Sequence, residues 1–212
     1  MRFKTIISTL INANLALGLV EQAPGEYEGI GSAGPYGAAG GRLSVGDYMG
    51  SDTFWKVVME VIGRVENQVL PGKEWNPADH ADVVGDKDQT HHSYGIFQMT
   101  EPYVKDAVQH WPHIKNHPDY TGDHVTDVNN PVISSLILQA YMDRYLDVNE
   151  DDITTPHDLI VKIAATHQAG GTIGHEGWED RPHGSRYIEG KGTWQGVNDI
   201  LPSVTTKHTD GP

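Results

Sequence analysis

One short run near the middle of the chain combines residue types that could form part of a binding surface: Ser93-Tyr94-Gly95-Ile96-Phe97-Gln98-Met99-Thr100. A glycine inside such an apolar and aromatic run indicates that two backbone segments approach each other closely. Gln98 adds an amide, which both donates and accepts hydrogen bonds, to a stretch that otherwise looks buried. We therefore expect a backbone-lined shelf here, with a few polar groups on it.

Glu66 is the group that could do chemistry opposite this shelf. It lies toward the end of an amphipathic segment, residues 54–69, beside the apolar stripe rather than on the polar face. A carboxyl group in that position is partly removed from water, which favours its protonated form. Glu66 is therefore the candidate general acid, at the edge of a cleft that the shelf faces.

Composition and charge exclude several classes of protein. The chain has 212 residues, with 15 Lys and Arg against 29 Asp and Glu, for a net charge of −14. This balance argues against nucleic-acid binding, which needs clustered cations, and against electrostatic attachment to anionic membranes. No stretch is long and apolar enough to predict a membrane span. Because there is no cysteine, disulfides and thiol catalysis are excluded.

The N-terminal quarter of the chain reads differently from the rest. Residues 1–21 carry two cations and then an apolar stretch, from which we expect a retained helix that docks on a partner, with a secretory signal as the alternative. Residues 22–51 are rich in glycine and predict a linker or arm, or else a disordered leader. We expect the compact domain over residues 52–201 and a loosely held polar tail over residues 202–212.

Hydrophobic periodicity predicts a mainly helical domain. Capping residues place the starts of four helices at Asp52, Thr100, Asn130 and Thr155. The first should stop at Pro71-Gly72, and residues 185–188 should form a short helical turn or an extended piece. Turn-forming residues fill positions 73–92, so we expect a small irregular or β lobe between the first two helices.

Four pieces of the sequence, taken in order, resemble the lysozyme-like superfamily and, within it, the lytic transglycosylases and goose-type lysozymes. They are Glu66, the run Ser93-Tyr94-Gly95-Ile96-Phe97-Gln98-Met99, the run Ala165-Thr166-His167-Gln168-Ala169-Gly170, and Arg186-Tyr187-Ile188. The family pattern is a glutamate at a helix end, a shelf of the Gly-Leu-Met/Phe-Gln type, an Ala-Tyr-Asn-x-Gly turn and a later tyrosine. The resemblance covers roughly residues 52–190 and implies an α+β lysozyme-like fold.

The resemblance implies cleavage of the β-1,4 bond between N-acetylmuramic acid and N-acetylglucosamine in peptidoglycan, with Glu66 as the general acid. A hydrolase would also need a second carboxylate, for which Asp86 is the most plausible of Asp82, Asp86 and Asp88. A transglycosylase would use Glu66 alone and leave a 1,6-anhydro product. The sequence leaves both outcomes open, and the motifs imply no cofactor.

The same resemblance assigns the remaining site residues. Ser93 and Tyr94 would line the floor of the cleft, Gln98 and Gln168 would bind acetamido groups of the substrate, and Tyr187 would orient Glu66. Each also has a structural alternative, such as packing for Tyr94 and hydrogen bonding to buried backbone for Gln98. We expect no metal site, because the twelve histidines include no His-Glu-x-x-His helix and read better as loop residues.

Two positions depart from the family pattern, and they keep a second interpretation open. The Tyr-Asn pair is His167-Gln168 here, and the serine that often follows the glutamate is Asn67. The alternatives to a peptidoglycan-cleaving enzyme are a non-catalytic structural protein of a virion with the same scaffold, and a chitin-directed relative. The arm favours a virion location, in the tail or inside, where other virion proteins are partners; a secreted or periplasmic location is the alternative.

Overall fold

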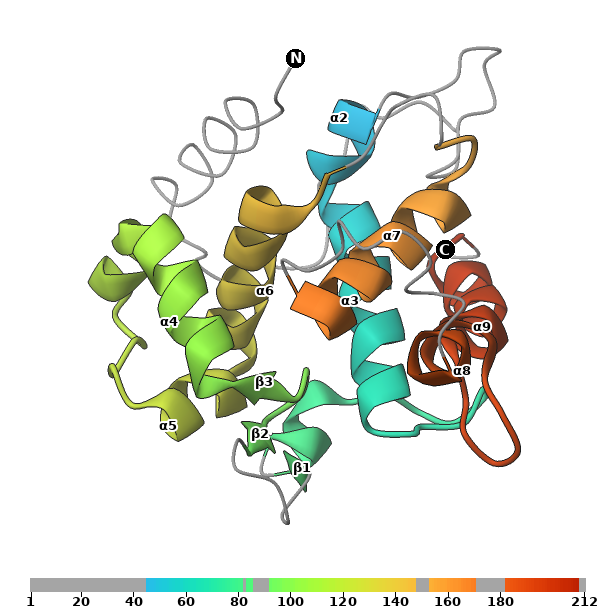
Figure 1. Ribbon diagram of the computed structural model, residues 1–212, viewed down its shortest axis with the longest axis horizontal. Coiled ribbons are helices and arrows are strands. Elements are labelled where there is room, and N and C mark those ends of the chain that lie inside the picture. Colours follow the sequence, from blue (N-terminus) through green and yellow to red (C-terminus); the bar gives the residue numbers. More distant parts are fainter. Residues whose placement is uncertain (1–44, 82, 86–91, 148–152, 171–181, 210–212) are drawn as a thin grey trace, which may run out of the picture.

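The computed structural model describes residues 45–81, 83–85, 92–147, 153–170 and 182–209. Helices make up most of this part of the chain, and three short strands form one antiparallel sheet (Figure 1). The prediction of a mainly helical domain with a small β portion is therefore confirmed. The docking helix expected over residues 1–21, and most of the arm expected over residues 22–51, lie outside the described residues.

Helix α3, Asp52–Glu66, runs through the middle of the domain and ends close to the sheet (Figure 1). Ser51 fixes its start, because the serine side chain accepts a hydrogen bond of 3.3 Å from the Phe54 N–H. The cap therefore lies one residue before the predicted Asp52. Helices α7 (Pro156–Ala169) and α9 (Val197–Thr209) pack against α3. This packing fixes the direction of α3 and hence the place where Glu66 emerges.

The end of α3 is also earlier than predicted, since the helix stops at Glu66 rather than at Pro71-Gly72. Asn67 caps it, and both its backbone N–H and its side-chain Nδ2 donate to the carbonyl of Gly63. Gln68 then adopts a φ of +52°, in the left-handed region, and turns the chain away. Glu66 thus occupies the last helical position.

The domain begins earlier than the expected residue 52. Residues Val45–Met49 form helix α2, and Val45, Tyr48 and Met49 are buried. The indole N–H of Trp55 donates to the carbonyl of Met49 at 2.9 Å, which ties α2 to α3. Glycine content alone placed residues 45–50 in the arm; their apolar side chains place them in the core.

The small sheet contains strands β1 (Val84–Gly85), β2 (Ser93–Tyr94) and β3 (Met99–Thr100) in that order. Tyr94 pairs with Met99 across the tight connection between β2 and β3, and with Val84 on the other side. A 3-10 turn, Pro77–His80, precedes the sheet. The predicted lobe between the first two long helices is therefore present, and its last two strands contain the shelf sequence.

Four helical segments follow the sheet: α4 (Glu101–His110), the 3-10 helix η2 (Pro112–Asn116), α5 (His124–Asn129) and α6 (Pro131–Tyr145). Thr100 and Asn130 are the N-caps of α4 and α6, as predicted, although the side chain of Thr100 makes no capping hydrogen bond. Helices α4 and α6 pack against each other on the side of α3 opposite α8 and α9 (Figure 1).

The last three helices close the domain. Thr155 caps α7 in a capping box with Asp158, which confirms the predicted start. Residues 185–188 lie inside helix α8, Pro182–Glu189, so the helical alternative holds. The prediction of a loosely held tail from residue 202 is wrong for its first residues. Helix α9 continues to Thr209, and Leu201 and Val204 are buried.

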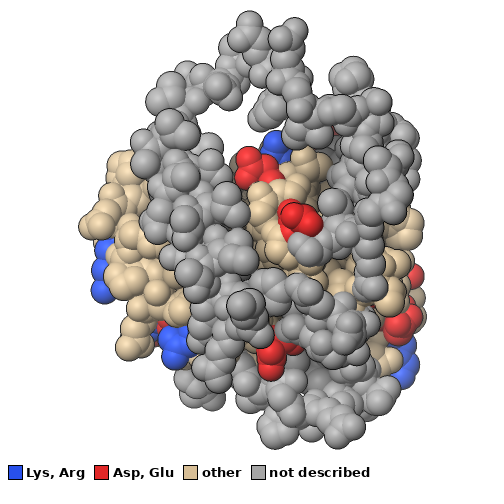
Figure 2. Space-filling view, turned by 90° about the horizontal axis from the view of Figure 1, so that it is seen from above, with Lys and Arg blue, Asp and Glu red and all other residues tan. Residues whose placement is uncertain are grey.

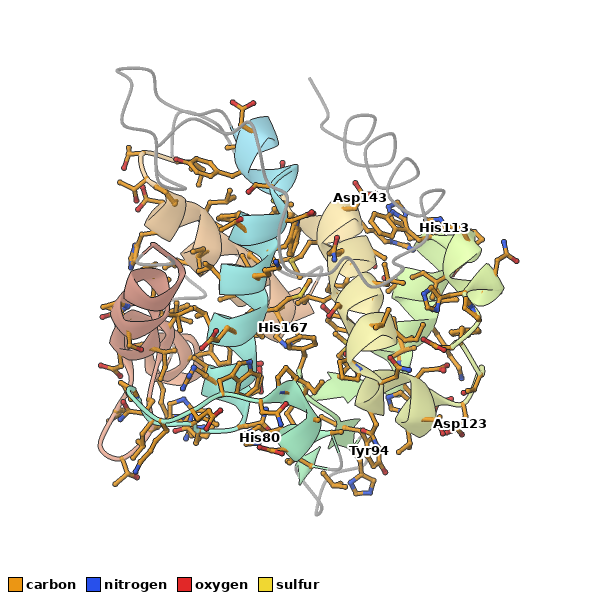
Figure 3. The ribbon with its side chains drawn as sticks, turned by 180° about the vertical axis from the view of Figure 1, so that it is seen from behind. His80, Tyr94, His113, Asp123, Asp143 and His167 are labelled. Atoms are coloured by element: carbon orange, nitrogen blue, oxygen red, sulfur yellow. The ribbon has the colours of Figure 1, made fainter. Side chains whose placement is uncertain are left out.

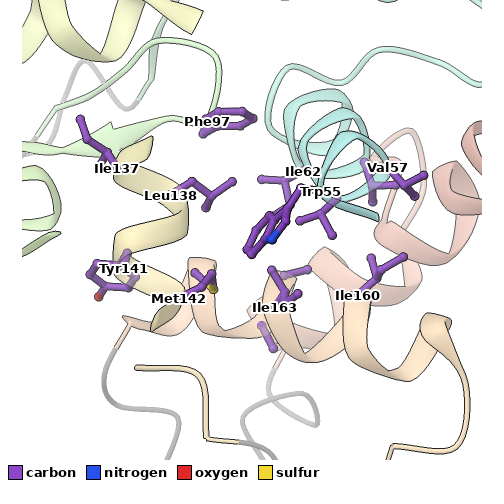
Figure 4. Packing of buried hydrophobic residues seen from close by; sticks show 14 of the residues in the cluster. Trp55, Val57, Ile62, Phe97, Ile137, Leu138, Tyr141, Met142, Ile160 and Ile163 are labelled. Carbon is purple, nitrogen blue, oxygen red and sulfur yellow. The ribbon is translucent and has the colours of Figure 1, made fainter. Parts of the chain in front are cut away.

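The core lies where α3, α6 and α7 meet. Figure 4 shows Ile62 and Trp55 of α3 facing Leu138 and Met142 of α6, with Ile163 of α7 between them. Phe97, from the turn between β2 and β3, is 3% exposed and joins this cluster. Burying a side chain of this size stabilises a fold by about 1.5–3 kcal/mol. The shelf is therefore anchored in the same core that fixes α3.

Candidate active site

Glu66 is nearly enclosed, although it stands at a helix end. Its side chain is 11% exposed. Two flanking residues hold the backbone around it: Asn67 closes the helix, and the amide of Gln68 exchanges hydrogen bonds with the backbone of Gln195, at 2.8 Å from the Gln195 N–H and 3.2 Å to its carbonyl. The position of the carboxylate is therefore determined by contacts with both the shelf and the loop before α9.

Tyr187 holds Glu66 directly. Its hydroxyl donates a hydrogen bond of 2.8 Å to Glu66 Oε1, so the contact predicted from the sequence is present. Tyr187 is 2% exposed, and burial, followed by the negative charge of Glu66, raises its pKa well above its ordinary range. The phenol therefore remains protonated and acts as a permanent donor to this oxygen.

His167 reaches the same oxygen from α7. Its Nε2 lies 3.4 Å from Glu66 Oε1 and 2.9 Å from the carbonyl oxygen of Phe97, and its side chain is 3% exposed. Figure 3 shows His167 in the middle of the domain, between the surrounding helices. Among the described residues, neither Tyr187 nor His167 contacts Oε2 of Glu66. Both contacts with Glu66 are thus made through Oε1.

The two departures from the family pattern both attach the shelf to helices. Asn67 Nδ2 donates to the carbonyl of Ile96 at 2.7 Å, in addition to its bond to Gly63. His167 Nε2 donates to the next carbonyl, that of Phe97. Asn67 and His167 therefore fix consecutive peptide groups of the shelf, one from the end of α3 and the other from α7. These two residues are part of the support of the site.

Gly95 confirms the close approach predicted from its place in the run. It has a φ of +74°, and a Cβ added there would lie 2.3 Å from the carbonyl oxygen of Val128 in α5. Only glycine fits both the left-handed backbone and this spacing. The shelf is consequently held against α5 as well as against α3 and α7.

Gln98 and Ser93 bond within the lobe. Gln98 Nε2 donates to the carbonyls of Gly95 at 2.8 Å and Val83 at 3.2 Å, and its Oε1 accepts from the Ser93 hydroxyl at 3.0 Å. Gln98 has a φ of +49°, so its backbone is constrained as well. The structural alternative for Gln98 therefore holds, and these hydrogen bonds already occupy the amide predicted to bind an acetamido group.

Tyr94 lies in strand β2 of the lobe, and Gln168 lies in helix α7. The ring of Tyr94 meets His124 edge-on, with centroids 5.4 Å apart, out on the lobe (Figure 3). His124 in turn bonds the carbonyl of Met99. Gln168 follows His167 in the last turn of α7 and is half-buried. Asp86, the candidate second carboxylate, lies outside the described residues, as do Asp82 and Asp88.

A buried ion pair supports the loop that leaves the site. Arg64 is 4% exposed and lies 2.9 Å from Glu60, one turn earlier on α3. Its guanidinium also donates to the carbonyls of Leu70 and Lys73, which are 3.4 Å and 2.9 Å away. The loop after Asn67 is therefore fastened to the same helix that carries Glu66.

Tyr103 is the residue of this site that sequence reasoning missed. Its hydroxyl lies 3.1 Å from His167 Nδ1, and its ring stacks on Tyr141 with centroids 3.6 Å apart. Burial raises the pKa of Tyr103 well above its ordinary range, with further contributions from Tyr141 and Glu66. The only signal in the sequence was an aromatic residue in the first turn of the helix after the shelf, which is equally typical of packing.

A separate hollow of about 640 Å³ lies between α4, η2 and α5. Its lining includes Lys105, Lys115, Tyr120 and Asp123, and none of the residues around Glu66. The part of the chain that the structure describes contains no group of three or more metal-ligating side chains. No helix in that part is long and apolar enough to cross a membrane.

Comparison with protein-family models, with curated protein sequences and with solved structures gives no match to this chain.

Proposed function

We propose that this protein cleaves the β-1,4 glycosidic bond of peptidoglycan on a lysozyme-like scaffold, with Glu66 as the general acid. The observation that carries the proposal is a single carboxyl group, 11% exposed, held through Oε1 at the end of a helix and opposite a constrained backbone shelf. Such a carboxyl can deliver a proton in a fixed direction. The order of motifs along residues 52–190 supports the same assignment.

The reaction requires a proton on the leaving oxygen while positive charge develops on the sugar. Glu66 Oε2 donates that proton, the C1–O bond breaks with its electron pair on the leaving oxygen, and Glu66 becomes a carboxylate. Tyr187 stabilises this carboxylate, because a hydrogen bond to a charged acceptor is stronger than one to a neutral acceptor. The hydrogen bond from Tyr187 to Glu66 is thus strongest after Glu66 has given up its proton.

Two routes complete the reaction. In a transglycosylase, the 6-hydroxyl of the sugar attacks C1 and returns its proton to Glu66, which leaves a 1,6-anhydro product. In a hydrolase, water attacks C1 and a second carboxylate assists. Asp86 remains the candidate for that carboxylate, and it is outside the described residues. The proposal therefore covers both routes.

A zymogram and a turbidity assay on purified peptidoglycan test the proposal. We expect clearing by the unchanged protein and a loss of roughly 100-fold or more in Glu66→Gln, because a positioned general acid contributes about 10²–10⁴-fold. Glu74→Gln is the matched control, since Glu74 is an exposed carboxylate in the loop after α3. Equal clearing by Glu66→Gln would remove Glu66 from the mechanism. No clearing by any variant would favour the non-catalytic scaffold.

The virion location remains a prediction of the N-terminal segments. Both segments lie largely outside the described residues, so the site geometry bears on the reaction alone.

A further inference from the structure

His167 poses a chemical problem for a general acid. An imidazole ordinarily holds a proton more tightly than a carboxyl group, since the pKa of a free histidine side chain is about 6.5 and that of a free glutamate about 4.3. A histidine next to Glu66 would therefore be expected to take the proton and leave Glu66 as a carboxylate. His167 Nε2 is only 3.4 Å from Glu66 Oε1. Something must keep this ring neutral if Glu66 is to act as an acid.

The hydrogen bonds of the ring specify where its hydrogen lies. The Phe97 carbonyl, 2.9 Å from Nε2, can only accept, so Nε2 carries a hydrogen. On the other side, the hydroxyl of Tyr103 lies 3.1 Å from Nδ1. Among the described residues, Nδ1 is the one hydrogen-bond partner of that hydroxyl. If Tyr103 donates to Nδ1, then Nδ1 is an acceptor and the ring is neutral.

We propose that Tyr103 locks His167 in its neutral form, with the hydrogen on Nε2, and thereby keeps the proton of the pair on Glu66. The inference rests on the proposed function for its catalytic consequence, although the lock itself does not. Tyr103 and His167 are positioning residues in this scheme, and Glu66 alone gives the proton to the substrate.

Protonating His167 at Nδ1 would break the hydrogen bond from the Tyr103 hydroxyl. A second hydrogen on Nδ1 would point at the Tyr103 hydroxyl, which would then have to turn its own hydrogen toward some other acceptor. Tyr103 is half-buried, its ring is stacked on Tyr141, and burial raises the pKa of its hydroxyl, which opposes that turn. An unpaired buried hydroxyl is costly, so the neutral ring is favoured.

The other groups that face His167 do not replace the lock. They are Glu66 from α3, Tyr103 from α4, Tyr141 from α6 through its stack on Tyr103, and Tyr187 from α8 through Glu66. Three of these four are phenols, and burial raises the pKa of Tyr103 and of Tyr187. Glu66 is the one carboxyl group of the four, and its negative form would favour a charged ring.

Nitrogen-15 NMR of the histidine rings tests the lock on the full chain. We expect His167 to show a neutral ring with the hydrogen on Nε2 at pH 7, and to keep that signature on acidification to pH 5. In Tyr103→Phe, we expect the ring to become charged at a pH about one unit higher, the equivalent of one ordinary hydrogen bond. Tyr145→Phe is the control, because the ring of Tyr145 also packs against Tyr141, with centroids 4.7 Å apart, but its hydroxyl bonds Asp106.

The pH profile of peptidoglycan cleavage gives the second measurement. In Tyr103→Phe, the pH above which cleavage activity is lost should fall by about the same one unit. When His167→Gln is already present, adding Tyr103→Phe should change this pH little. A charged ring in the unchanged protein at pH 7, or a neutral ring with its hydrogen on Nδ1, would overturn the proposal. The NMR signal does not require activity. If the protein fails to cleave peptidoglycan but the NMR result is as expected, the proposed function is wrong and the proposal for Tyr103 and His167 holds.

Discussion

Two side chains, Tyr187 and His167, converge on the same oxygen of Glu66. They come from helices that lie about 100 residues later in the chain, so the arrangement is a product of tertiary packing. Glu66 and Tyr187 could be predicted from the sequence, because each lies in a motif with a recognisable order. The Tyr103–His167 contact could not, since it joins residues 64 positions apart with no periodicity to connect them.

Tyr187→Phe tests this arrangement at the scale of one hydroxyl. We expect kcat to fall by about 10- to 100-fold with little change in KM, because a hydrogen bond to a charged acceptor is worth roughly 1.5–3 kcal/mol and is strongest after Glu66 loses its proton. Steady-state rates on soluble glycan fragments measure both constants. An unchanged kcat, with folding intact by circular dichroism, would show that Tyr187 does not support the acid.

At the scale of elements, the helix caps were predicted best and the loops least. Asn130 and Thr155 were placed correctly, because a cap is a local hydrogen bond between near neighbours. The end of α3 was misplaced, because Asn67, which closes the helix at the Gly63 carbonyl, is also held by the Ile96 carbonyl of the shelf, 29 residues later. Glycine content also hid α2, whose place in the core depends on contacts with α3.

Gly95→Ala tests the close contact between the shelf and α5. We expect a loss of roughly 2–4 kcal/mol in the free energy of unfolding, because the added methyl group meets both a left-handed backbone and the Val128 carbonyl. Gly72→Ala is a matched control with a φ of +75° and no atom within 4 Å of the added Cβ, and should lose only about 1–2 kcal/mol. Urea unfolding measures both. Equal losses would mean that the shelf does not approach α5 this closely.

Asp158→Asn tests the cap of α7, the helix that carries His167. Hydrogen bonds from Thr154 and Thr155, opposed in part by burial, lower the pKa of Asp158 from its ordinary 3.8 to about 2. A carboxylate with a lowered pKa stabilises the fold above pH 4 and loses that contribution as the pH falls toward 2. We therefore expect the variant to be about 1 kcal/mol less stable at pH 7.

The difference in stability between Asp158→Asn and the unchanged protein should shrink between pH 4 and pH 2. Thermal unfolding measures this difference. A difference that stays constant over this range would show that the charge of Asp158 does not contribute to the cap.

At the scale of the whole molecule, the net charge of −14 would set how the protein meets the proposed substrate, an anionic polymer. On the face drawn in Figure 2 the acidic residues are scattered, and lysine or arginine residues lie both near the margins and beside acidic residues. A molecule of this charge is repelled by a cell wall of the same sign at long range. Salt should weaken that repulsion, because the Debye length falls from about 30 Å at 0.01 M to about 8 Å at 0.15 M.

We therefore expect the rate of peptidoglycan clearing to rise by a few-fold as NaCl increases from about 10 to about 150 mM. Cleavage of a short uncharged glycan should change little over the same range, which makes it the control. A clearing rate that falls steeply with salt would instead indicate a cationic surface that attracts the polymer.

In the proposed reaction, the carboxyl group of Glu66 protonates the leaving oxygen as the glycan is cut. Mass spectrometry of the fragments released from purified peptidoglycan tests it most directly, because it reads the bond that was cut. We predict soluble disaccharide-containing fragments from the unchanged protein, ending in a 1,6-anhydro or a reducing sugar, and none from folded Glu66→Gln. The same fragments from Glu66→Gln, or intact glycan strands after treatment with the unchanged protein, would contradict this account.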